Sequence, residues 1–155
     1  MRIGAARDQL ILELDTARAR VMEAITGLTE EQLSRQEMDG WSVKDHLNHL
    51  TACDEIRFFE IGRVSRGGQP TFRGLDGTPS DVFNETIVSH RRPLSTEQVL
   101  ADLAFTRTLV LEAIAGAPEP ALSRDAYGDY PVDGSIGHDI AHAEIIESWR
   151  KRMNI

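Results

Sequence analysis

The chain has 155 residues and a formal net charge of −8, with 41% hydrophobic and 27% charged residues. This composition is typical of a soluble globular protein, and the length allows one domain with a sizeable core, residues 1–155. Nucleic-acid binding is not expected, because it requires clustered Lys and Arg. No apolar run approaches the roughly 20 residues that span a bilayer, and the N-terminus lacks the apolar stretch of a signal peptide. We therefore expect a cytoplasmic protein that acts on a small molecule.

Hydrophobic residues recur with a helical period in four long segments. These segments are residues 5–26, 43–63, 96–115 and 135–153, and shorter helices are predicted at 30–34 and 80–90. Capping pairs support three helix starts: Thr29 with Gln32, Ser42 with Asp45, and Ser95 with Gln98. No segment alternates with period two for long enough to form a strand. The predicted fold is all-α, a four-helix bundle with a long crossover between its second and third long helices.

The crossover contains a segment rich in Gly and Pro, residues 65–79, with few large apolar side chains. Segments of this kind inside a compact domain are commonly functional or mobile. We interpret it as a long connection or a lid.

Four histidines and the single cysteine are candidates for a metal site. His138 and His142 are four residues apart, which places both imidazoles on one helix face. Two imidazoles do not saturate a divalent ion, so a third ligand must come from elsewhere. His46 and His49 both qualify, and periodicity does not separate them. Cys53, one turn after His49, is a further candidate, although a lone Cys on a helix is usually a small core residue.

Three nitrogen ligands with an open position are typical of a catalytic rather than a structural metal site. The alternative is an inert pair of hydrogen-bonded histidines at the boundary of the core, because a pair of histidines four apart also arises by chance.

Other polar residues are candidates for supporting roles. Three arginines on predicted helices could bind a carboxylate, although a solvated or surface-paired arginine is the simpler interpretation of each: Arg57, Arg107 and Arg150. Three acids could accept hydrogen bonds from imidazole N–H groups, or else cap helices and face solvent: Asp45, Asp139 and Glu144. His90, which lies in a polar stretch, is expected to be solvated.

The order of these motifs resembles that of the DinB/YfiT-like superfamily. WSVKDHLNHL, residues 41–50, is similar to the family motif in which a Trp-Ser/Thr turn opens the second helix. DVFNETIVSHRR matches its Asn-containing helix, and the spaced histidine pair closes the pattern on the last helix. The resemblance covers nearly the whole chain. It implies an up-down-down-up bundle with a divalent-metal site, for zinc or nickel, formed by His49, His138 and His142. His46 is then expected to point toward solvent or into a hydrogen bond.

The resemblance also implies a range of activities, because relatives include metal-dependent thiol transferases, a thiol-dependent isomerase and hydrolases. We favour an S-transferase that uses a low-molecular-weight thiol as cosubstrate. A metal-dependent hydrolase and a non-catalytic metal or small-ligand binding module are the alternatives. The ligands do not choose among them, since a bound ion lowers the pKa of water and of a thiol alike.

A homodimer is expected from the second long helix. Phe58 and Phe59 are adjacent there, on a helix whose other face is committed to the core. Exposed aromatic patches tend to mark interfaces.

Overall fold

The structure is a computed structural model that describes residues 3–72 and 78–155. In this part of the chain six α-helices are found: α1 (Ile3–Ile25), α2 (Glu30–Ser34), α3 (Val43–Ser65), α4 (Thr78–Arg91), α5 (Thr96–Gly116) and α6 (Gly134–Met153). Two short 3₁₀ helices, η1 (Glu119–Leu122) and η2 (Arg124–Tyr127), join α5 to α6. No strand is present among the described residues, which carry one β-bridge between Met38 and Trp41. The predicted all-α fold is confirmed.

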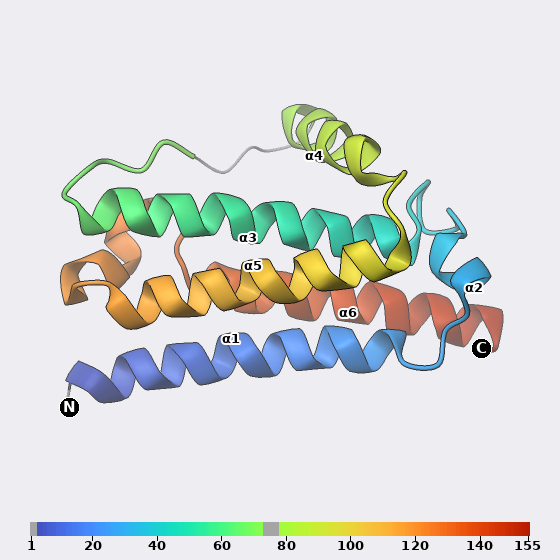
Figure 1. Cartoon of the computed structure of the whole chain (residues 1–155), viewed down its shortest axis with the longest axis horizontal. Coiled ribbons are helices and arrows are strands. Elements are labelled where there is room, and N and C mark those ends of the chain that lie inside the picture. Colours follow the sequence, from blue (N-terminus) through green and yellow to red (C-terminus); the bar gives the residue numbers. More distant parts are fainter. Residues whose placement is uncertain (1–2, 73–77) are drawn as a thin grey trace.

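The four long helices lie side by side with nearly parallel axes (Figure 1). α1 and α6 run in one direction and α3 and α5 in the other, as the colours along the chain show. α3 packs mainly against α5, and α1 against α6. α4 lies outside this group and packs on α3. The crossover between α3 and α5 therefore contains a helix of its own.

The observed helix starts agree with the capping signals in the sequence. Thr29 and Ser42 each begin a full capping box, in which the side chain three residues later bonds back to the backbone of the capping residue. Ser95 accepts a hydrogen bond from the Gln98 backbone at 3.2 Å, but the Gln98 side chain donates to Asp102 instead. The box predicted at Ser95 is therefore wrong in its second half.

The core consists of two apolar clusters, one toward each end of the bundle, and every long helix contributes to both. Between the clusters four buried charged residues, one from each long helix, bond to one another: Arg18 on α1, Asp54 on α3, Arg107 on α5 and Asp139 on α6. We call these four residues the charge tetrad. All four are at most 6% exposed.

The charge tetrad is closed by short hydrogen bonds. Asp139 accepts from Arg18 Nε and from Arg107 Nη2, both at 3.0 Å. Asp54 accepts from Arg18 Nη2 and from Arg107 Nε, both at 3.1 Å. Two positive and two negative charges cancel, and charge-assisted bonds of this kind offset part of the cost of burying them. The tetrad therefore ties α1, α3, α5 and α6 together at one level.

Two surface expectations meet the structure only in part. Phe59 is 66% exposed and Phe58 is half-buried, so the aromatic pair is partly on the surface. The homodimer stays a prediction.

The lid interpretation of residues 65–79 falls partly on residues 73–77, which lie outside the described residues. None of the described helices combines the length and apolarity needed to cross a membrane.

Candidate metal centre

Four histidines from two helices meet near the start of α3. His46 and His49 lie in the first two turns of α3, and His138 and His142 lie one turn apart on α6. Trp41, immediately before α3, covers the α3 pair, with ring centroids 5.2 Å from His46 and 5.4 Å from His49. Helical spacing places the members of each pair on one face, and the packing of α6 beside α3 brings the two pairs together.

The Nε2 atom of His138 lies close to the Nε2 atoms of two other histidines. His49 Nε2 is 3.0 Å from His138 Nε2, and His142 Nε2 is 3.1 Å from the same atom. Ligand nitrogens about 2.05 Å from a tetrahedral Zn²⁺ lie roughly 3.3 Å apart, so these separations suit one ion. These two contacts are compatible with the predicted ligand set of His49, His138 and His142, which stays a prediction.

His46 takes a different position from the other three. Its Nδ1 atom lies 2.8 Å from His142 Nδ1, on the ring edge of His142 that faces away from His138. The side chain is 5% exposed. His46 therefore contacts a candidate ligand through a hydrogen bond, one of the two positions expected for it.

Burial keeps all four imidazoles uncharged. It lowers the pKa of His46 to about 4 and, together with the neighbouring imidazoles of His138 and His46, that of His49 to about 3. The pKa values of His138 and His142 are also lowered, mainly by burial. At neutral pH each ring therefore keeps one nitrogen lone pair, which is the form that binds metal.

Cys53 belongs to the same cluster. Its Sγ atom is 3.7 Å from His49 Nε2, and the candidate ligand atoms of His49, Cys53 and His138 all lie within 4.8 Å of one another. Burial raises the pKa of the Cys53 thiol to about 12, so without a metal it stays protonated. This group shares two members with the predicted ligand set and differs in the third, Cys53 in place of His142.

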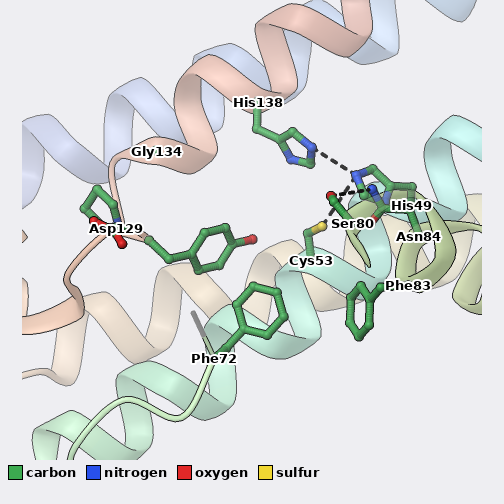
Figure 2. A pocket seen from close by; sticks show the side chains of 11 residues that line it. His49, Cys53, Phe72, Ser80, Phe83, Asn84, Asp129, Gly134 and His138 are labelled. Atoms are coloured by element: carbon green, nitrogen blue, oxygen red, sulfur yellow. Dashed lines mark hydrogen bonds between the residues drawn. The ribbon is translucent and has the colours of Figure 1, made fainter. Parts of the chain in front are cut away.

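A pocket of about 370 Å³ opens beside the cluster. His49, Cys53 and His138 form one side of it (Figure 2). Phe72 and Phe83 stand opposite them in the same view. The site therefore combines candidate metal ligands with a cavity large enough for a small molecule.

The three arginines considered from the sequence do not line this pocket. Arg57 is 1% exposed, stacks on the Tyr130 ring with Cζ 4.0 Å from its centroid, and donates to the Tyr130 carbonyl at 2.6 Å. Arg107 belongs to the charge tetrad. Arg150 donates to the backbone carbonyls of Ala24 and Thr26. The simpler interpretation, a solvated or surface-paired side chain, is wrong for Arg57 and Arg107, because protein acceptors and an aromatic ring replace water around them.

The three acids take structural roles. Asp45 caps α3 through Ser42 and pairs with Arg92. Asp139 belongs to the charge tetrad, and Glu144 pairs with Arg20 at the surface. No imidazole N–H among the described residues is bonded to any of the three, so their alternative role as histidine partners is not found.

Sequence reasoning missed Glu60, which shapes the pocket. Its buried carboxylate accepts from the Thr71 backbone and hydroxyl, both at 2.8 Å, and from the Phe72 backbone at 3.2 Å. Glu60 is 3% exposed. These bonds hold Phe72 against Tyr130, with ring centroids 4.8 Å apart. The sequence signal for this role was the position of Glu60, an acidic residue on the face of α3 that is turned toward the protein interior.

Comparison with known proteins supports the fold and the family. A family model of the DinB superfamily matches residues 13–146. This chain belongs to the DinB superfamily. In this DinB-superfamily protein the partly buried cluster of His49, Cys53 and His138 is a candidate metal-binding site.

The fold is also similar to that of an uncharacterised protein from Escherichia coli UTI89. Its crystal structure aligns with a TM-score of 0.79 over 96% of this chain and 95% of that chain, at 19% sequence identity. At this identity the likeness concerns the fold alone. No curated protein matches the chain.

Proposed function

We propose that this protein is a divalent-metal-dependent enzyme that joins a low-molecular-weight thiol to a small electrophile, an S-transferase. The proposal is supported by the contacts of His138 Nε2 with the Nε2 atoms of His49 and His142, beside a pocket that His49 and His138 line. Zinc and nickel are the proposed metals, because both accept imidazole ligands and leave positions open. The proposed compartment is the cytoplasm, where low-molecular-weight thiols stay reduced.

Each part of the site has a defined task in this proposal. When bound, the ion would lower the pKa of a coordinated thiol and so supply a nucleophile at neutral pH. The three imidazoles hold the ion, and the pocket lined by Phe72 and Phe83 holds the electrophile. In the reaction an S–C bond forms, the bond to the leaving group breaks with its electron pair, and the thiol proton passes to solvent.

Two other functions use the same residues. A metal-dependent hydrolase would activate water instead of a thiol, and a binding module would retain the metal without turnover. Among the described residues that line the pocket the one carboxylate, Asp129, is exposed, so no buried carboxylate is present there to act as the general base of a hydrolase. We therefore place the transferase first.

Turnover assays separate the three functions. Protein loaded with zinc or nickel is incubated with a panel of intracellular thiols and a model electrophile, and thiol consumption is followed after subtraction of the uncatalysed rate. The expected result is consumption that requires both metal and protein and disappears in His138→Ala. Hydrolysis of an ester without thiol would support the hydrolase, and metal binding without either reaction would support the binding module.

We also propose a homodimer that uses the surface around Phe59. Sedimentation velocity at micromolar concentration tests this proposal. We expect a dimer for the unaltered chain and a monomer for Phe59→Ser, and a monomeric unaltered chain would contradict it.

A further inference from the structure

The pocket beside the histidines has aromatic walls from three separate segments. Phe72 precedes the crossover helix, Phe83 lies on α4, and Tyr130 follows η2. The Phe72 ring contacts both others, with centroids 4.8 Å from Tyr130 and 5.7 Å from Phe83. The planes are inclined by 61° and 46°, so the rings form an angled wall and not a filled stack.

The described lining offers little to a charged ligand. It carries no Lys or Arg. Its only charged side chain is Asp129, at the exposed rim, and its other polar side chains are uncharged: His49, Cys53, Ser80, Asn84, Tyr130 and His138. Arg57, the cation behind Tyr130, is already occupied by the carbonyl and ring of that residue. Without a bound metal, an anion in this pocket would lose water and meet no positively charged side chain of the lining.

The wall is also held in place before any ligand enters. Glu60 accepts three hydrogen bonds from Thr71 and Phe72, two of them from backbone N–H groups, which fix the backbone that carries the Phe72 ring. A site that is already ordered loses less entropy on binding.

From these observations we infer that the pocket binds a flat, uncharged aromatic group, which is the body of the electrophile. This inference rests on the proposed function for the role of the ligand, but not for its binding. Aromatic rings prefer offset or edge-to-face contacts, which the angled wall offers to one further ring.

Equilibrium binding to the metal-free protein tests the inference without turnover. Benzamide is titrated and followed by NMR chemical shifts, with cyclohexanecarboxamide and benzoate as matched probes. We expect benzamide to bind more tightly than both. Phe83→Leu should weaken benzamide binding about 2- to 10-fold, the range of one aromatic contact, and leave cyclohexanecarboxamide unchanged. The control Phe105→Leu, on an exposed side chain of α5, should change neither.

Tighter binding of benzoate, no binding of benzamide, or equal effects of the two Phe variants would overturn the inference. Benzamide binding with no thiol transfer in any assay would instead remove the proposed function and leave the aromatic pocket standing.

A second inference comes from the contact between His46 and His142. Their Nδ1 atoms are 2.8 Å apart, so one of them must carry the shared proton. His142 Nε2 faces His138, and it can bind metal only if its own proton sits on Nδ1. His46 must then be the acceptor.

We propose that His46 is a positioning residue that selects the metal-binding tautomer of His142. Metal-bound histidines almost always donate their second ring N–H to an acceptor, commonly a carboxylate or carbonyl. Here the acceptor is a neutral imidazole, so it orients His142 without adding negative charge beside the ion.

Zinc titration of the metal-free protein against a competing chelator tests this role. His46→Leu should weaken zinc binding about 10- to 100-fold, the usual cost of losing such a partner. His46→Asn, which can place an amide oxygen near the Nδ1 position, should restore most of that affinity. ¹⁵N NMR of the zinc-loaded protein should show the proton of His142 on Nδ1.

Equal losses in His46→Leu and His46→Asn would contradict the acceptor role. Loss of zinc as complete as in His142→Ala would show instead that His46 is itself a ligand. A proton on Nε2 of His142 in the loaded protein would also overturn the proposal.

Discussion

The bundle contains two buried polar groups, the charge tetrad and the histidine cluster, which are neighbours in the sequence yet opposite in character. Cys53 precedes Asp54 on α3, and His138 precedes Asp139 on α6, so adjacent residues enter different groups. In the tetrad each charge meets an opposite charge, bonded at 3.0–3.1 Å. In the histidine cluster neutral rings face one another and open onto a pocket.

The difference between the charge tetrad and the histidine cluster distinguishes structural from functional polar residues in this fold. The tetrad is closed, because its charges sum to zero and its members bond to each other. The histidine cluster is incomplete, because His138 Nε2 faces the Nε2 atoms of both His49 and His142, and one ring nitrogen cannot pair fully with both. Like neighbours cannot satisfy one another fully, whereas a cation can satisfy several lone pairs at once.

The largest effect is expected in the tetrad. Asp54→Asn removes one negative charge and leaves the two arginines with a single carboxylate in the core. We expect the free energy of unfolding to fall by about 3–5 kcal/mol, the usual cost of breaking a buried ion pair. Urea unfolding followed by circular dichroism measures the change. Glu147→Gln, in an exposed ion pair on α6, is the control and should change stability little. Comparable losses of unfolding free energy in both variants would show that the tetrad contributes no more to stability than an exposed ion pair.

The histidine cluster should respond in metal binding more than in stability. His142→Ala leaves two imidazoles in the predicted set, so zinc affinity should fall by more than 100-fold, beyond the loss of a supporting residue. Elemental analysis after dialysis measures retained zinc, and unfolding of the metal-free variant should change less than that of Asp54→Asn.

Cys53→Ala is the matched variant for the ligand assignment. If His142 is the third ligand, Cys53→Ala keeps its zinc. Retention in His142→Ala with loss in Cys53→Ala would assign the site to His49, Cys53 and His138 instead.

Glu60 is an intermediate case, a buried carboxylate that accepts hydrogen bonds from the neutral groups of Thr71 and Phe72 and one from the half-exposed Arg63. Its expected effect is the smallest. Burial alone would raise its pKa, but hydrogen bonds from Thr71 and Phe72, and a further one from Arg63, lower it below its ordinary value. Its contribution to stability is therefore present above the unfolded pKa, about 4.5, and is lost as pH falls through the lower folded value.

Unfolding free energies of the unaltered chain and of Glu60→Gln, compared between pH 6 and pH 3, test this expectation. The difference should be on the order of 1 kcal/mol at pH 6 and should shrink as the carboxylate is protonated. The histidines titrate in both proteins, so their effect cancels in the comparison. A difference that stays constant with pH would contradict the assignment.

Much of the fold could be predicted from the sequence, because its determinants are local. Helical periodicity placed the long helices within about two residues of their observed ends, and the caps at Thr29 and Ser42 formed as expected. The spacing of His138 and His142 also decided that they share a face, since backbone geometry alone sets that relation.

The tertiary structure decided which side chains meet across helices. Arg107 stood in line with the apolar stripe of α5, a signal that it is buried, but its partners Asp54 and Asp139 lie 53 and 32 residues away. Two further contacts depend in the same way on how the helices and the crossover pack together. One joins His46 to His142, and the other joins the Glu60 carboxylate to the backbone of Phe72. One helix face cannot specify which face of another helix it meets, because that depends on packing of the whole core.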